Sequence, residues 1–352
     1  MTGERQRARE RRSLAGEATH SVRAGVSGTC VAKVGRMSLR SGTRARDPSA
    51  TRPYAILEAP SILGLTPTGV DELPGALLSH GLAERIQARH AGRVETPPYD
   101  PRRDPETLVL NAHAIAAWTP RLADAVEAVI DRGEFPVVLG GDCSIVLGST
   151  LALRRRGRCG LLFIDGHADF YQPEVDPSGQ AASMDLALAT GHGPKLLTEF
   201  EGRCPLVRSE DAVAFGFRDG DEQAEYGSQP LPAELRAFDL AAIRELGVEA
   251  ASRAAVAHLT REQVAGFFIH VDADCLDDDV MPAVDYRLAG GLSWDELATT
   301  LGVALASGRA RGIEVAIYNP RLDPDGAAGR RLSQLLADVL GTRAPGPADR
   351  GG

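Results

Sequence analysis

The stretch Phe163-Ile-Asp165-Gly-His167-Ala-Asp169 begins inside an apolar run, residues 160–164. Directly after this run it has three potential metal ligands at alternate positions. Alternate residues of an extended chain share a face, so the three side chains are expected to converge where the strand opens into a loop. Mixed carboxylate and imidazole ligands favour manganese, iron or zinc over magnesium and calcium, which prefer oxygen alone. The alternative is a strand end whose polar side chains only bond to the loop backbone.

A second stretch, Val271-Asp272-Ala-Asp274-Cys-Leu-Asp277, ends another apolar run, over residues 266–271. Two buried carboxylates on one face repel each other and lose their hydration, so they need cations. Two such motifs, each closing a strand, predict a metal centre, and the number of carboxylates favours two ions over one. His270 is expected to share the face of Asp272 and is a candidate catalytic group that orients the carboxylates.

A third strand, expected over residues 135–139, ends in Gly140-Gly-Asp-Cys143-Ser144. Paired glycines let the backbone pass close to a ligand, and a thiolate is a good ligand for borderline metals. Cys143 is therefore a candidate metal ligand. The alternative is a small core residue beneath the loop, which is the usual role of a lone cysteine.

Apolar runs alternate with helical patterns along most of the chain. This alternation predicts an α/β fold with a parallel sheet covered by helices on both faces, whose ligands lie at the carboxyl ends of the strands. Further strands are expected over residues 54–57, 212–217 and 312–317. Helices are expected over residues 73–88, 114–132 (with a bend or its true start near Pro120), 145–155, 184–190, 234–246, 293–307 (with a capping box from Ser293 to Glu296) and 327–340.

Composition limits the class of protein. The 352 residues carry a net charge of −9, yet residues 1–50 hold eleven Lys/Arg against four Asp/Glu. An acidic body with a basic tail does not suit a nucleic-acid-binding domain. No apolar run reaches 18 residues, which predicts no membrane span, and five cysteines without a CxxC pair fit a cytoplasmic protein without disulfides. We expect a disordered basic tail over residues 1–52, one domain that carries the metal motifs over 53–342 and a disordered tail over 343–352.

Taken together, the three motifs resemble those of the arginase/agmatinase/formimidoylglutamase family, the ureohydrolases. Gly140-Gly-Asp-Cys-Ser144 is similar to that family's Gly-Gly-Asp-His-Ser, and Asp165-Gly-His-Ala-Asp169 to its Asp-Ala-His-x-Asp. Asp272-Ala-Asp-Cys-Leu-Asp277 is similar to its Asp-x-Asp-x-Leu-Asp-Pro. Shorter matches lie at residues 69–74, 290–293 and 319–320, and the resemblance covers about residues 54–341.

This resemblance implies a three-layer α/β/α sandwich with a central, mostly parallel sheet, a homo-oligomer (trimer or hexamer) and two bridged Mn²⁺ ions. By the family pattern, Asp165 and Asp272 bridge the ions. His167 and Asp274 complete the ligand set of one ion, and Asp169 with position 143 completes that of the other. A metal-bridging hydroxide then attacks the central carbon of a guanidinium, and urea and an amine are released.

Three departures from the family pattern alter these expectations. Cys143 replaces a metal-binding histidine, which is expected to weaken or change the first-ion site. The family's His-Gly-x-Pro loop, with its catalytic histidine, corresponds here to residues 181–185, where Asp185 is the candidate catalytic replacement. Ile317 takes the register of the glutamate that pairs with guanidinium. Glu314 is kept as a candidate substrate-binding residue, although three positions along a strand place it on the opposite face.

The loop over residues 171–180 follows the first metal motif, and in arginase-like proteins such a loop holds the amino-acid end of the substrate. Ser178 and Gln180 are candidates to bond a carboxylate, and Glu174 or Asp176 to hold an ammonium. The alternative is a polar surface loop with turns imposed by proline.

The expected function is that of a metal-dependent hydrolase of non-peptide C–N bonds in a linear amidine, guanidine or amide. One alternative is a non-catalytic metal-binding relative, which the three departures favour. A second is a hydroxyguanidine-specific amidinohydrolase. A third is a deacetylase-type hydrolase with a single zinc, which the metal count would separate from a two-manganese centre. The expected partner is a small-molecule substrate, with no nucleic acid and no membrane.

Overall fold

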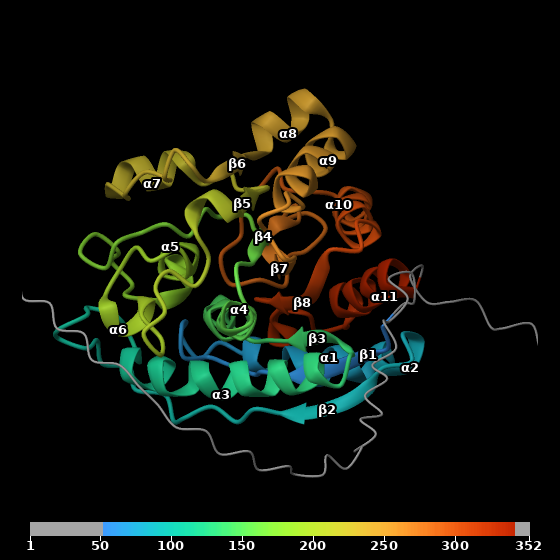
Figure 1. The fold of residues 1–352 in the computed structure, drawn as a ribbon, viewed down its shortest axis with the longest axis horizontal. Helices are drawn as coiled ribbons and strands as arrows, with labels where there is room; N and C mark the ends of the chain where they lie inside the picture. The colour runs from blue at the N-terminus through green and yellow to red at the C-terminus, as the bar shows by residue number, and fades with distance from the viewer. Residues whose placement is uncertain (1–51, 342–352) are drawn as a thin grey trace, which may run out of the picture. The chain divides into compact units, whose positions relative to one another are not determined.

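The computed structural model describes residues 52–341, which form an eight-stranded parallel sheet between two layers of helices (Figure 1). The strand order is β2-β1-β3-β8-β7-β4-β5-β6, and each neighbouring pair is parallel. This confirms the expected α/β class. The strands are β1 Tyr54–Glu58, β2 Arg89–Arg93, β3 Phe135–Leu139, β4 Gly160–Ile164, β5 Ala212–Phe215, β6 Arg236–Phe238, β7 Phe267–Asp272 and β8 Ala310–Ala316.

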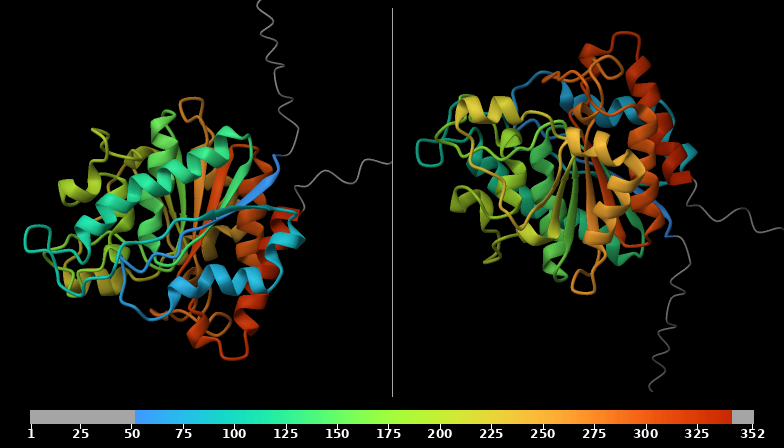
Figure 2. Two further views of the ribbon diagram at one scale, coloured as in Figure 1. Left: turned by 90° about the horizontal axis from the view of Figure 1, so that it is seen from below. Right: turned by 90° about the horizontal axis from the view of Figure 1, so that it is seen from above.

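Helices cover both faces of the sheet, as the views of Figure 1 and Figure 2 show. On one face α3 packs on β1 and β3, and α4 packs on β7. On the other face α9 packs on β4, β5 and β6, and α10 lies between α9 and α11. The helices are α1 Leu73–Ser79, α2 Leu82–Arg85, α3 Ala112–Asp131, α4 Val146–Arg155, α5 Asp185–Ala189, α6 Lys195–Thr198, α7 Gly220–Tyr226, α8 Leu240–Leu246, α9 Val248–Leu259, α10 Trp294–Ala306 and α11 Ala327–Gly341.

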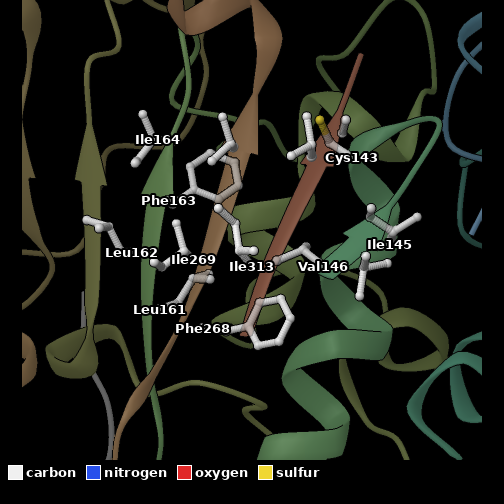
Figure 3. Close-up of a cluster of buried hydrophobic side chains, with 14 of the residues drawn as sticks. Cys143, Ile145, Val146, Leu161, Leu162, Phe163, Ile164, Phe268, Ile269 and Ile313 are labelled. Carbon is white, nitrogen blue, oxygen red and sulfur yellow. The ribbon is translucent and has the colours of Figure 1, made fainter. Parts of the chain in front are cut away.

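The middle of the sheet is apolar because its strands are covered on both sides. Every residue of β3, β4 and β7 is buried, which explains their near-continuous apolar sequences. Figure 3 shows side chains of β4, β7 and β8 gathered in one cluster, with the Cys143 sulfur at one end of it. The core therefore fixes the strands whose ends carry the predicted ligands.

Most predicted elements are present, and the differences have local causes. The helix expected over residues 73–88 is divided into α1 and α2, because Gly81 adopts a left-handed conformation with φ of 77°. Pro120 lies inside α3 and does not start it. The helix expected over residues 234–246 was wrong in its first part, where Arg236–Phe238 pairs with β5 as an edge strand. The capping box of Ser293 and Glu296 is confirmed at the start of α10.

Besides β6, two helices, one short helix and one strand were not predicted: α7, α9, α6 and β2. The strand β2, with the sequence Arg-His-Ala-Gly-Arg, is largely exposed at the sheet edge and lacks an apolar pattern. The tails expected over residues 1–52 and 343–352 lie outside the described residues, apart from Arg52. Over residues 52–341, no helix is both long and apolar enough to cross a membrane.

Candidate metal centre

The predicted ligands meet at the carboxyl ends of the four central strands. Cys143 lies just beyond β3, Asp165 just beyond β4, and Asp272 is the last residue of β7. The strand β8 separates β3 from β7, and β7 lies beside β4. Because all the strands are parallel, these ends share one edge of the sheet, where ligands of open α/β sheets bind.

Two groups of side chains there have the composition of metal sites. In the first, Cys143, Asp165, His270 and Asp272 each offer one ligand atom, and these atoms all lie within 4.8 Å of one another. In the second, Asp165, His167 and Asp274 do the same. Asp165 belongs to both groups, which suits a ligand shared by two ions. The sequence missed His270 as a possible ligand, because only its register in β7 brings it there.

Asp169 belongs to neither of these groups, although it is buried and lines the same cavity. Its backbone is left-handed, with φ of 45°, a conformation that aspartate tolerates better than most residues. The structure thus brings five of the six predicted metal ligands into the two groups and leaves Asp169 beside them.

Backbone N–H groups orient the carboxylates. Asp165 Oδ1 accepts from the His167 backbone N–H at 2.7 Å, and Asp272 Oδ1 accepts from that of Asp274 at 2.7 Å. Each aspartate therefore directs its second oxygen toward the centre. At Gly166 a Cβ atom would come within 2.6 Å of the Asp274 carbonyl oxygen, so a glycine is required where the two motifs approach each other.

The electrostatics of the cluster show an excess of negative charge. Burial, followed by the charge of Asp274, raises the pKa of Asp165 to about 6. Burial and the neighbouring carboxylates raise the pKa of Asp169 and of Asp272 well above the usual value. His167 Nδ1 lies 3.1 Å from Asp274 Oδ2. Although burial opposes both shifts, this pairing raises the pKa of His167 and lowers that of Asp274.

Unpartnered polar atoms point to the same conclusion. Within residues 52–341, Asp165 Oδ2, His270 Nε2 and both carboxylate oxygens of Asp185 are buried and have no hydrogen-bond partner. Leaving such atoms unpaired is costly. One protonated histidine cannot balance so many carboxylates, whereas divalent cations can, so the residues present fit a metal centre.

Asp185 is the first residue of α5 and is fully buried. Burial, followed by the charges of Asp165 and Asp272, raises its pKa well above the usual value. The charges of the cluster therefore act on its carboxyl group, as expected of a candidate proton carrier, although Asp185 itself does not line the cavity. His192, the nearest histidine along the chain, instead lies 3.2 Å from Thr190 Oγ1 and packs on Phe170.

His270 and Glu314 form a buried pair between β7 and β8. The two residues are paired in the strand register, and His270 Nδ1 lies 2.8 Å from Glu314 Oε1. Ser149 donates to the other Glu314 oxygen, and the His270 ring stacks on Phe163 with centroids 4.7 Å apart. Neither His270 nor Glu314 lines the cavity, so we do not retain Glu314 as a substrate-binding candidate.

A cavity of about 540 Å³ lies over the cluster. Ser178 and Gln180 line it as predicted, whereas the exposed Glu174 does not. Asp176, the alternative candidate to Glu174, also lines it. The remaining wall comes largely from loops and from α7, which carry no motif that would have predicted them. The other polar and aromatic lining residues include Tyr171, Asp219, Glu222, Tyr226, Asp285, Tyr286 and Arg287.

Asp176 organises the predicted substrate loop. Its carboxylate accepts from Ser178 Oγ at 2.7 Å and from Ser183 Oγ at 2.6 Å, and Gln180 Oε1 accepts from Tyr286 O–H at 2.9 Å. Asp176 therefore fixes the loop that presents Ser178 and Gln180 to the cavity.

Ile317 lines the cavity in a left-handed conformation, with φ of 69°. This is strained for a β-branched residue, and its N–H donates to the Gly141 carbonyl at 2.8 Å. The cavity therefore presents an apolar group at the position where the sequence resemblance expects a glutamate.

Comparisons with known proteins agree with this geometry. The model of the arginase family matches residues 41–341. The chain is 29% identical over 305 residues to the arginase of Bacillus caldovelox. This alignment covers 83% of the present chain and 99% of the B. caldovelox protein. The chain is also 28% identical over 301 residues to the arginase of Staphylococcus aureus (strain COL), covering 83% and 98%.

The structural comparisons give the same fold. The native B. caldovelox arginase superimposes with a TM-score of 0.73 at 27% identity and covers 82% of this chain and 98% of that one. The proclavaminate amidino hydrolase of Streptomyces clavuligerus, at 18% identity and a TM-score of 0.58, covers 84% and 92% and shares the fold.

Proposed function

Since this chain belongs to the arginase family, we propose that it is a metal-dependent hydrolase that cleaves a non-peptide C–N bond in a linear amidine, guanidine or amide. The observation that carries the proposal is the pair of ligand groups joined by Asp165 at the floor of a cavity. Buried carboxylates of raised pKa are retained at a cost in stability, and that cost is expected where they bind metal.

The centre suits two divalent ions, and Mn²⁺ is what the family resemblance implies. Asp165 and Asp272 would hold the ions from the ends of β4 and β7, with His167 and Asp274 on one side. Bound ions there would polarise the substrate and lower the pKa of a water molecule. Asp185 lies buried beside them with a raised pKa and does not line the cavity, so a proton from its carboxyl group would reach the leaving amine through a bridging water molecule.

The wall of the cavity bears on the substrate. Ile317 offers no carboxylate for a bidentate pair with a guanidinium. A less basic group, such as an N-hydroxyguanidine, a formimino group or an amide, is buried here at a smaller cost in free energy, because less positive charge is left without a partner. Ser178 and Gln180 line the cavity and would bond the substrate's polar end. Arg287, which also lines the cavity, pairs with Asp278.

The test is a substrate panel on the metal-loaded protein. Guanidino, N-hydroxyguanidino, formimino and amide compounds are each incubated with it, and urea and ammonia are measured. Release of either product from a panel member, absent in Asp165→Asn, is the expected result. No product from any member in protein shown to contain two ions per chain would contradict the proposal.

One observation favours a non-catalytic metal-binding relative as the second candidate. Among the residues described, His167 is the only histidine that lines the cavity, and it is paired with Asp274. Such a relative would bind both ions yet release no product in the panel. The homo-oligomer that the resemblance implies, a trimer or hexamer, is a further part of the proposal, and light scattering gives the mass that tests it.

A further inference from the structure

The two ligand groups of the centre differ in chemistry. The group of Asp165, His167 and Asp274 supplies only nitrogen and oxygen, whereas the other group adds the sulfur of Cys143. Oxygen-rich sites suit Mn²⁺, and thiolate ligands select zinc and similar ions. The shared Asp165 therefore joins two sites of unequal softness.

His270 has the arrangement of a metal-binding histidine. Glu314 is a carboxylate and can only accept, so Nδ1 carries the proton and donates to it at 2.8 Å. In the neutral ring Nε2 then offers a lone pair, and it is buried with no partner among residues 52–341. Metal-binding histidines characteristically donate their other N–H to a carboxylate. Stacking on Phe163 and the hydrogen bond from Ser149 to Glu314 hold this arrangement in place.

Cys143 faces the same point from the other side of β8. Its Sγ lies 2.7 Å from Asp272 Oδ2, so the thiol proton sits where an ion would take its place. The four ligand atoms of this group lie within 4.8 Å of one another, and tetrahedral zinc requires separations of roughly 3.3–3.8 Å for its usual bond lengths. Binding of an ion therefore requires Cys143 Sγ and Asp272 Oδ2 to move apart.

We propose that Cys143, His270, Asp165 and Asp272 form a tetrahedral site selective for zinc, and that the site of Asp165, His167 and Asp274 beside it takes the harder ion. His270 thus supplies an imidazole ligand from β7, while position 143 supplies a thiolate. This inference rests on the metal-binding part of the proposed function and is independent of the substrate.

The first experiment uses cobalt as a spectroscopic probe. The full chain is stripped of metal with a chelator and titrated with CoCl₂, for wild type and Cys143→Ser. Cys159→Ser is the matched control, because Cys159 is also buried but lies at the opposite end of β4. We expect a thiolate-to-cobalt charge-transfer band in wild type and Cys159→Ser that is absent in Cys143→Ser. A wild type without the band, or a Cys143→Ser protein that keeps it, would overturn the proposal.

The second experiment measures affinity by competition with a zinc indicator. Nitrogen and oxygen sites also bind Zn²⁺ more tightly than Mn²⁺, so the decisive quantity is the change in the Zn²⁺/Mn²⁺ affinity ratio. We expect Cys143→Ser to lower this ratio about tenfold or more at one site only, and His270→Gln to weaken zinc binding at the same site. Unchanged zinc affinity in His270→Gln would remove His270 from the site.

Two further measurements keep the outcomes separate. If Cys143→Ser does not fold, Cys143→His provides the comparison, with both ions bound, no charge-transfer band and a lower Zn²⁺/Mn²⁺ ratio expected. Urea and ammonia release are measured on the same preparations. Hydrolysis without the band overturns this inference alone, whereas the band without hydrolysis overturns only the proposed activity.

Discussion

Cys143 Sγ lies 2.7 Å from Asp272 Oδ2, although 129 positions separate the two residues along the chain. The contact joins the ends of β3 and β7 across β8. Without an ion it is a hydrogen bond from a thiol to a buried carboxylate. The neighbouring carboxylates of the cluster repel one another. The metal-free centre is therefore the part of the sheet edge that gains most from a bound cation.

Removal of metal is expected to lower the thermal stability of the protein. Each ion that binds only the folded state stabilises it by about 2.7 kcal/mol at a hundredfold excess over Kd. For a domain of this size, chelation should therefore lower Tm by about 4 °C for each ion lost. Differential scanning fluorimetry with and without chelator measures the shift. Asp165→Asn, which removes the shared ligand, should show almost none; an equal shift in that variant would place the stabilising ion elsewhere.

The stability of the metal-free protein is expected to fall as pH rises. Burial raises the folded-state pKa of Asp165 to about 6, and those of Asp169 and Asp272 also rise. When the folded-state pKa of a carboxyl group is raised, its contribution to stability is fully present below the pKa of the unfolded chain, about 3.9. This contribution is lost as the pH rises through the folded-state pKa. In chelator, Tm should therefore be lower at pH 7.5 than at pH 5.5. With metal the trend reverses, because ligands must be deprotonated.

A variant separates this effect from the titration of other groups. Asp169→Asn keeps the shape of the side chain and removes one charge, so the difference in Tm between the two pH values should shrink in chelator. An unchanged difference would show that the pH dependence arises outside the centre.

Asp185→Asn is expected to reduce turnover and leave metal content unchanged. Asp185 is buried beside the ligands without belonging to either ligand group, and loss of a proton carrier typically costs about 10²–10⁴-fold in rate. Elemental analysis, kcat and Tm are measured together. Loss of an ion would instead identify Asp185 as a ligand.

Glu314→Gln is expected to lower zinc affinity by about 10–100-fold, the usual effect of removing a carboxylate that orients a metal-bound histidine. The positioning role predicts that the metal-free protein keeps most of its stability, since the glutamine carbonyl oxygen can still accept from His270 Nδ1 while its amide N–H donates to Ser149 Oγ. Zinc competition and Tm in chelator are the two readouts. A fall in Tm with unchanged zinc affinity would show that Glu314 only stabilises the fold.

Asp176→Ala is expected to raise KM more than it lowers kcat, because its carboxylate fixes the loop that carries Ser178 and Gln180. Loss of these bonds costs about 1–3 kcal/mol of loop order, or roughly 5- to 150-fold in KM. Glu174→Ala, in the same loop but exposed and outside the cavity, should change neither constant. An effect of Glu174→Ala as large as that of Asp176→Ala would restore the prediction that Glu174 holds the substrate.

The parts of this fold that could be predicted are those with a repeated local pattern. The apolar runs of β3, β4 and β7 are covered on both faces, and the acidic motifs follow them directly, so strand and ligand were readable together. The edge strands β2 and β6 lack such runs, because an edge strand exposes its side chains.

The role of His270 could not be predicted in the same way. Its sequence position indicates only the face it shares with Asp272, whereas its proposed role as a ligand depends on Glu314, which pairs with it from β8, and on Phe163, which stacks on it from β4. Partners from other strands are set by strand order, which no local motif encodes. The cavity wall from Tyr226 and Tyr286 was missed for the same reason.

The position of β8 also determines when the centre can exist during synthesis. It is the last strand to leave the ribosome, yet it lies between β3 and β7, in the middle of the sheet. A nascent chain that ends before Ala310 carries the acidic motifs and the thiol, but the two halves of its sheet have nothing to join them. The group of Asp165, His167 and Asp274 spans only β4 and β7, which pair directly, whereas Cys143 reaches Asp272 only once β8 joins β3 to β7. The part of the centre that contains the thiol is therefore the last to assemble.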